Sequence, residues 1–445
     1  MKKNIKVSTA LLLTLALTGS LLAGCSSGSK TATGNSDKPI TLIYWTQNAE
    51  PYVKVAKDLA AKFHAKNPNI SIKVESFPTY AVKANTALST NTAPDVLELY
   101  GSTVSLAKGG KILPVPDSVM TKAIADKTFY PQALANRLYN GKYYGLPNEI
   151  NMESPGLLIN LDLVKKAGLT IPDEWIKNNG PRTWTELVEF AKKLIVIKSG
   201  TMKQAGLGVI GGQSESMFLS LIWQFGGDYR DQKNNKVNFD TPEAKKAVEF
   251  MKGLLIGPNQ VETKGSDSRF DGFKGGTNAM TIGAPWYASE LDSNVKGLKY
   301  QYFNLPPFVD GAKPNFVGEG GWGYLVTKQG KNPDAAWKFV KFMLQKENQD
   351  VWAQAVGSVS SRKDSPVAFT YDPLIGSTNK ALSISQNITK YGNDPGAYTM
   401  DTVQLIWTMV RQNLKAMLQG EVTVDAGLKQ LDKQANDMIQ RNLAR

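Results

Sequence analysis

Cysteine and histidine are almost absent from this chain of 445 residues, which has one of each. The cysteine is Cys25, and because residues 26–445 have none, no disulfide can stabilise them. Their stability must come from a hydrophobic core, which a chain of this length can bury. The sole histidine, His64, excludes a His-Glu-x-x-His zinc site, and it excludes a Ser-His-Asp triad unless His64 itself acts. Since His64 ends a lysine-rich segment with helical periodicity, we expect it to be exposed.

Long apolar runs and phosphate-binding loops are also missing. After Cys25 no apolar stretch reaches the ~18 residues of a membrane-spanning helix. No Walker A sequence occurs, so any ATPase partner is a separate protein. Gly206–Gly211 fits the letters G-x-G-x-x-G, but no buried strand precedes it, and we expect a glycine-tolerant strand instead of a dinucleotide site. No cofactor and no metal are expected.

The charge is strongly positive, with 52 Lys and Arg against 39 Asp and Glu and a net charge of +13. The lysines are spread along amphipathic segments, without an arginine-rich block or an aromatic-basic RNA signature. We therefore expect solvated lysine-rich surfaces and no nucleic-acid partner. The excess is also compatible with an anionic wall, membrane or ligand.

The first 24 residues have the organisation of a secretory signal. Lys2, Lys3 and Lys6 precede an apolar stretch over residues 10–22 that is too short to span a membrane. The run Leu-Leu-Ala-Gly-Cys over 21–25 resembles the lipobox of bacterial lipoproteins, which implies that Cys25 carries a diacylglycerol and becomes the mature N-terminus. Two acyl chains give durable anchoring. The alternative is a plain signal peptide with a chance cysteine.

We accordingly expect residues 1–24 to be a lipoprotein signal peptide and residues 25–38 a flexible tether, since SSGSKTATGNSDK is small and polar. The signal holds three lysines, so its removal leaves a net charge of about +10. The expected location is the cell membrane, lipid-anchored on the extracytoplasmic face, and the expected host is a Gram-positive bacterium.

The segment after the tether alternates between strand and helix. Strands are predicted at 40–45, 70–77 and 96–100, and helices at 51–64 and 82–88. This order favours a parallel sheet covered by helices, in which ligands bind beyond the carboxyl ends of the strands. Thr183 is predicted to cap a further helix with Glu186 as its capping-box partner. More helices are predicted at 215–225, 242–255, 333–345 and 421–441, with a small turn and hairpin over 226–239.

Several segments, in order, resemble the extracellular solute-binding lipoproteins of ABC importers, the carbohydrate-binding family related to maltose-binding protein. They are ITLIYW, APDVLELY, GKYYGLP, LLINLDLVKKAGL with PRTWTELVEFAKKL, FKGGTNAMTIGAPW and GGWGYLVTKQGKNPDAAWKFVKFML. The resemblance implies an α/β, two-lobed periplasmic-binding-protein-like fold with a hinge and an interlobe ligand cleft. It places lobe one at 39–153 plus 304–346 and lobe two at 154–303 plus 347–445. The hinge segments would fall near 151–156, 303–306 and 345–348.

Sugar binding requires flat aromatic side chains for the apolar faces of the ring and polar groups for its hydroxyls. Trp45 ends the first predicted strand and is one candidate. Trp286 and Tyr287 follow a Gly-Ala-Pro entry, and Trp322 lies in a glycine-rich segment that allows close backbone approach. In the family, aromatic residues at these last two locations contact the ligand. Other tryptophans, including Trp184, Trp223, Trp337 and Trp407, are expected in the core.

The polar candidates lie at strand ends and next to the expected hinge. Glu149, Asn151 and Glu153 would share one side of an extended strand. Carboxylates accept strong hydrogen bonds from hydroxyls, although surface glutamates are more often simply solvated. Further candidates at strand ends or in loops are Gln47, Asn48, Tyr80, Glu98 and Glu319.

The sequence thus predicts a substrate-binding subunit of an ABC importer that captures a carbohydrate, preferentially an oligosaccharide, and delivers it to the membrane subunits of a permease. We expect a monomer without enzymatic activity. One alternative is an exported glycan-active hydrolase with two carboxylates flanking the scissile bond. Another is a surface glycan sensor without transport. Peptide and polyamine ligands also remain open, because one fold serves many substrate classes.

Overall fold

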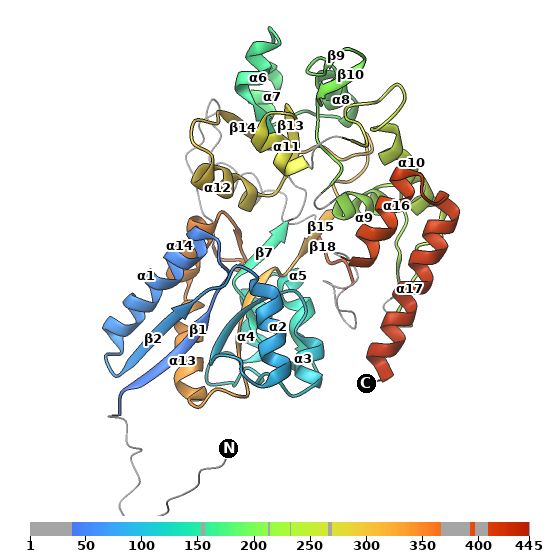
Figure 1. Ribbon diagram of the computed structural model, residues 1–445. Coiled ribbons are helices and arrows are strands. Elements are labelled where there is room, and N and C mark those ends of the chain that lie inside the picture. The colour runs from blue at the N-terminus through green and yellow to red at the C-terminus, as the bar shows by residue number, and fades with distance from the viewer. Residues whose placement is uncertain are drawn as a thin grey trace, which may run out of the picture. The chain divides into compact units, whose positions relative to one another are not determined.

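The computed structural model describes residues 38–152, 156–211, 214–231, 233–265, 269–365, 392–396 and 408–444 (Figure 1). The description below concerns residues 39–445. Cys25, Glu153 and Trp407 lie outside the described residues. Among the helices that are described, none has the length and apolar character needed to cross a membrane.

The N-terminal part builds a five-stranded sheet with the order β2-β1-β3-β16-β6. β1 (Ile40–Trp45) pairs in parallel with β2 (Ile70–Glu75) and with β3 (Val96–Tyr100), which confirms the predicted parallel sheet. β16 (Trp322–Val326) returns from far along the chain to pair antiparallel with β3 and β6 (Leu146–Pro147).

Helices cover this sheet and form the first hydrophobic core with it. α1 (Glu50–Lys66) and α2 (Tyr80–Thr90) confirm the two predicted helices. α1 buries Val55, Leu59 and Phe63 at the helical period, and its lysines stay exposed. α13 (Pro333–Met343) and α14 (Lys346–Val356) contribute to the same core through Phe339, Trp352 and others.

A second core surrounds the three-stranded sheet β13-β8-β14, formed by β8 (Gly156–Asn160), β13 (Met280–Gly283) and β14 (Tyr300–Asn304). Its helices are α8 (Trp184–Lys192), α9 (Ser214–Gln224), α10 (Pro242–Gly253), α16 (Arg411–Gln419) and α17 (Val424–Ala444). The seam of α17 is buried at Val424, Leu428, Leu431, Ala435 and Met438, as its spacing predicts.

A four-stranded sheet with the order β17-β7-β15-β18 lies between these two groups of elements (Figure 1). β7 (Glu149–Met152) pairs antiparallel with β15 (Phe316–Glu319) and β17 (Val359–Ser360), and β18 (Gly392–Asn393) pairs in parallel with β15. This sheet brings together chain segments about 170 residues apart, near the first predicted hinge.

The remaining elements are short. The helices are α3 (Val104–Lys108), α4 (Lys122–Thr128), α5 (Pro131–Leu134), η1 (Ala135–Arg137), α6 (Leu161–Lys166), α7 (Asp173–Asn178), α11 (Arg269–Gly275) and α12 (Pro285–Asn294). The strands are β4 (Leu138–Tyr139), β5 (Lys142–Tyr143), β9 (Val196–Lys198), β10 (Thr201–Gln204), β11 (Arg230–Asp231) and β12 (Lys236–Val237), the last two forming the predicted hairpin.

Two local predictions are corrected in detail. Thr183 caps α8 by accepting from Glu186 N at 3.1 Å, but the Glu186 carboxylate accepts from Arg182 N and Trp175 Nε1 instead of closing a capping box. The segment over 206–210 is not a strand, and its one isolated bridge to the described residues joins Gly208 to Thr281. The reason is that Glu262 accepts hydrogen bonds from the backbone N–H groups of residues 209 and 210, which a strand ladder would need.

Candidate functional site

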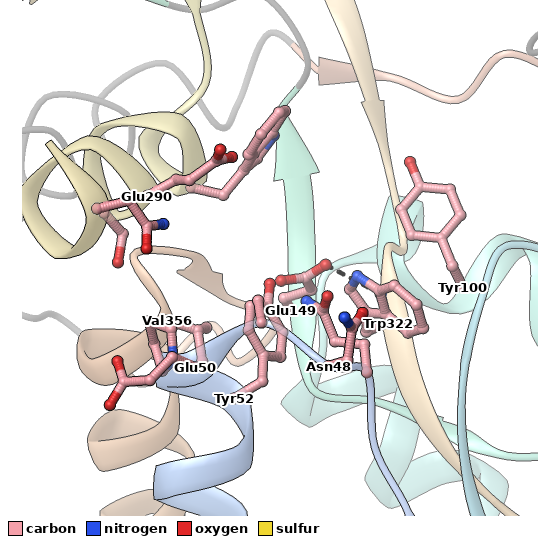
Figure 2. Close-up of a pocket in the computed structure, with 14 residues that line it drawn as sticks. Asn48, Glu50, Tyr52, Tyr100, Glu149, Glu290, Trp322 and Val356 are labelled. Atoms are coloured by element: carbon pink, nitrogen blue, oxygen red, sulfur yellow. Dashed lines mark hydrogen bonds between the residues drawn. The ribbon is translucent and has the colours of Figure 1, made fainter. Parts of the chain in front are cut away.

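A cavity of about 680 Å³ opens between α1, β7, β16 and α12. Its polar and aromatic lining comes from separate chain segments: Gln47, Asn48, Glu50, Tyr52, Tyr100, Glu149, Trp286, Ser289, Glu290, Asn294 and Trp322. Figure 2 shows Glu290 on α12 at one side of the cavity and Glu50, Tyr52 and Trp322 at the other. The volume is in the range of small-molecule sites.

One side of the cavity lies beyond the carboxyl ends of β1 and β3. The chain leaves β1 through Gln47 and Asn48 and enters α1, whose first turn supplies Glu50 and Tyr52. Tyr100 is the last residue of β3. This is the edge at which parallel α/β sheets bind ligands.

Trp322 is held as a half-buried aromatic surface by three tyrosines. Its ring centroid lies 6.5 Å from Tyr52, 5.8 Å from Tyr80 and 5.6 Å from Tyr100, in edge-to-face or tilted contacts. Its backbone N–H donates to Glu149 Oε1 at 3.0 Å (Figure 2). The aromatic ring and the carboxylate are therefore fixed relative to each other before any ligand enters.

The other side of the cavity is a face of α12. Trp286 is half-buried and contacts Phe270 at 5.5 Å between ring centroids, while Glu290 and Asn294 are exposed to the solvent in the cavity. Partial desolvation by the surrounding protein raises the pKa of Glu290, Lys274 lowers it in part, and Asp271 adds a smaller rise. Two tryptophans and several polar groups thus face one volume, which suits a ligand with apolar faces and hydroxyl edges.

Five of the residues predicted as ligand contacts line this cavity: Gln47, Asn48, Glu149, Trp286 and Trp322. Four others do not line it. Trp45, Tyr80, Glu98 and Tyr287 are buried, with 7%, 5%, 0% and 2% of their surface exposed. Their role as ligand contacts stays a prediction.

These four buried residues have protein partners. Trp45 Nε1 donates to Glu75, and the ring packs on Phe77. The Tyr80 hydroxyl donates to the backbone carbonyl of Trp45 at 3.0 Å, and the Tyr287 hydroxyl donates to that of Phe270 at 2.7 Å. These contacts fix the side chains just beneath Trp322 and Trp286.

Glu98 is the centre of a buried network below the cavity. It accepts from Asn148 Nδ2 at 2.6 Å, from the Tyr44 hydroxyl at 3.3 Å and from the Thr46 hydroxyl. Burial raises the pKa of Glu98 to about 7, although these hydrogen bonds lower it in part. The network connects β1, β3 and the segment that leads into β7.

Two further predicted contacts, Asn151 and Glu319, lie on strands and are not among the lining residues of the cavity. Asn151 and Glu319 lie opposite each other in the antiparallel pair of β7 and β15. Glu153 lies outside the described residues, as does the lipidation candidate Cys25. Among the residues that the structure describes, no group of three His, Cys, Asp or Glu side chains could hold a metal ion.

Sequence reasoning missed Glu50, Tyr52, Tyr100, Ser289, Glu290 and Asn294. Tyr52 lies in the first turn of the helix that follows the first strand, and Tyr100 ends the third strand, so the strand-end rule could have found both. Ser289, Glu290 and Asn294 follow Trp286 by three, four and eight residues. That is the helical period, and it would have indicated one shared face if a helix had been predicted there.

The chain was compared with known proteins. The family model described as bacterial extracellular solute-binding protein matches residues 46–350. The sn-glycerol-3-phosphate-binding periplasmic protein UgpB of Escherichia coli is 24% identical over 449 residues, covering 92% of this chain and 94% of its own length.

Two solved structures show the same fold. An ABC transporter solute-binding protein of Thermotoga lettingae, bound with alpha-D-tagatose, has a TM-score of 0.70 at 22% identity and covers 90% of this chain and 100% of its own. The maltose/maltodextrin-binding domain MalE of Bdellovibrio bacteriovorus, bound to maltotriose, has a TM-score of 0.69 at 22% identity with the same coverage. The predicted two-lobed α/β fold is confirmed.

Proposed function

The chain belongs to the bacterial extracellular solute-binding protein family, and we propose that it is the substrate-binding subunit of an ABC importer for a carbohydrate. Membership implies an extracytoplasmic location and a protein that binds a solute. The proposed cargo is an oligosaccharide, which the protein captures in the cavity below α12 and delivers to the membrane subunits of a permease.

The observation that carries the proposal is the pair of half-buried tryptophans, Trp286 and Trp322, on opposite sides of one cavity of about 680 Å³. Each ring offers a flat apolar surface, and polar side chains lie beside both. A pyranose has apolar C–H faces and a hydroxylated edge, so it uses both kinds of group. The bound tagatose and maltotriose of the two structural neighbours point in the same direction.

The proposal includes closure of the two lobes around the ligand, with β7 and β15 as crossing segments. The packing of Trp352 against Tyr52 in the first core and the presence of Phe316 in the second core favour crossings at 318–321 and after 356. Lobe one would then consist of about 39–152 plus 322–356. A ligand held from both sides stabilises the closed arrangement.

A sugar panel tests the proposal. Purified protein is titrated with neutral, amino and acidic mono- to tetrasaccharides while its tryptophan fluorescence and its melting temperature are followed. We expect a saturable fluorescence change and a higher melting temperature with at least one saccharide. If only sn-glycerol 3-phosphate, a peptide or a polyamine gives a response, the carbohydrate assignment is wrong.

We also propose that Cys25 carries the lipid that keeps the receptor at the membrane. Mass spectrometry of the mature protein should find a diacylglycerol on an N-terminal Cys25. Cys25→Ala should release the protein into the medium or leave its signal uncleaved. An unmodified mature N-terminus at another residue would contradict the anchor.

A separate experiment distinguishes the receptor from a hydrolase. On prolonged incubation of the purified protein with glycans, we expect no cleavage.

A further inference from the structure

The charge of the cavity is opposite to the charge of the chain. Lys and Arg outnumber Asp and Glu by 52 to 39 in the sequence. Yet Glu50, Glu149 and Glu290 line the cavity, and among the described lining residues there is no Lys and no Arg. A concave site with one sign of charge attracts ligands of the other sign.

Two of these carboxylates are available to a ligand. Glu50 and Glu290 are exposed within the cavity, and neither makes a salt bridge or a side-chain hydrogen bond within the described part of the chain. Figure 2 shows them on α1 and α12, on opposite sides of the volume. Glu149 is 4% exposed and already accepts from the Trp322 backbone.

The helix dipoles do not cancel this charge. α1 and α12 each place first-turn residues, Glu50 and Trp286, at the cavity, and each helix N-terminus is equivalent to roughly +0.5 charge. The two ends together offset about one carboxylate, and three carboxylates line the site. Lys274 and Asp271 also act electrostatically on Glu290, with opposite signs. The balance stays negative, so an anionic ligand such as a glycerol phosphate or a uronate is disfavoured.

We propose that the preferred ligand is a saccharide that carries a protonated amine, held with its ammonium group between Glu290 and Glu50. This inference rests on the proposed carbohydrate function and specifies its substrate class. The four aromatic rings at the cavity add to the preference, because Trp and Tyr faces attract cations. An ammonium has three donors, and carboxylate oxygens accept strong charge-assisted hydrogen bonds from it.

Matched sugars that differ in one group provide the test. Each sugar is titrated by calorimetry at neutral pH. The sugars are glucose, glucosamine and glucuronate, the corresponding galactose derivatives, and cellotriose with the matching trimer of glucosamine. We expect the amino member of the bound series to bind at least about tenfold more tightly than the neutral member. The uronate should bind most weakly. Raising the ionic strength from about 0.01 M to about 1 M shortens the Debye length from about 30 Å to about 3 Å and should reduce the preference.

Glu290→Gln should lower the amino-to-neutral affinity ratio while leaving the affinity for the neutral sugar within a few fold. Glu50→Gln should act in the same direction. Glu421→Gln changes the net charge equally on an exposed surface residue outside the cavity and should leave the ratio unchanged.

The outcomes separate this inference from the proposed function. Equal or tighter binding of the neutral or acidic member overturns the amine preference and leaves the carbohydrate function standing. Binding of spermidine without any saccharide overturns both. An amine preference that survives in the Glu50→Gln/Glu290→Gln double variant overturns the assignment to these two carboxylates.

Discussion

The backbone N–H of Trp322 donates a hydrogen bond to the Glu149 carboxylate at 3.0 Å, although the two residues are 173 positions apart. Glu149 begins β7 and Trp322 begins β16. The bond therefore fixes an aromatic surface and a hydrogen-bond acceptor at one edge of the cavity. Such fixed geometry reduces the ordering cost of ligand binding.

Replacing Trp286 by alanine should weaken sugar binding by about 1–3 kcal/mol, a range taken by analogy from base stacking on aromatic side chains. Its ring contacts Phe270 and Tyr287 and is only half-buried, so the melting temperature should change little. Calorimetric titration measures the effect, and Trp286→Phe should keep part of the affinity. An unchanged dissociation constant in Trp286→Ala would remove this ring from the site.

Trp322→Ala should weaken binding by a similar amount and should also lower the stability. The reason is that its ring packs against Tyr52, Tyr80 and Tyr100, and removing an aromatic ring from such a cluster leaves a cavity. Urea unfolding and titration of the same sample separate the two effects. Loss of stability with full affinity would assign Trp322 to the core alone.

Glu149→Gln keeps an oxygen that can accept from Trp322 N but loses the charge that strengthens this bond and any bond to a sugar hydroxyl. Because charge-assisted hydrogen bonds are roughly twice as strong as neutral ones, we expect about a tenfold loss of affinity. Glu189→Gln, on an exposed helix position paired with Lys192, is the matched control. Equal affinities of the two variants would show that Glu149 serves the fold only.

Glu98 should make the stability depend on pH. Its pKa is about 7 in the folded protein and near 4.5 when unfolded, so the folded state binds the proton more tightly. Between these values the free energy of unfolding should fall as the pH rises, by up to about 3 kcal/mol. The contribution of protonated Glu98 to stability is fully present below about pH 4.5 and is lost above about pH 7.

Glu98→Gln should remove this dependence. The amide oxygen can still accept from Thr46 and Tyr44, and once the Asn148 amide turns over, the new amide N–H can donate to Asn148 Oδ1, which is buried without a partner among the described residues. The measurement is urea unfolding of both proteins from pH 4 to pH 8. Parallel stability curves would contradict the shifted titration of Glu98.

The elements whose side chains alternate between core and solvent could be predicted from the sequence. α1 and α17 follow the helical period in their buried residues, and β1 to β3 follow from short apolar runs between turns. The segment over 206–210 could not be predicted, because the carboxylate that binds its backbone belongs to Glu262, about 50 residues away.

The lining of the cavity was predictable where an aromatic residue follows a glycine-rich or proline-containing turn, as at Trp286 and Trp322. The burial of Trp45 and Glu98 was not predictable, because only the three-dimensional packing of Phe77, Asn148 and Tyr44 decides that they are covered. Glu290 lies in no recognisable sequence motif. It became a candidate only once the structure placed it on α12, across the cavity from Glu50 (Figure 2).

The most direct test of the central claim is a calorimetric titration of the purified protein with the matched neutral, amino and acidic saccharides, in parallel with Trp286→Ala. We expect saturable one-site binding of at least one saccharide, and we expect the loss of Trp286 to weaken it. No heat and no thermal shift with any saccharide, or binding that is unaffected in Trp286→Ala and Trp322→Ala alike, would contradict a carbohydrate site in this cavity.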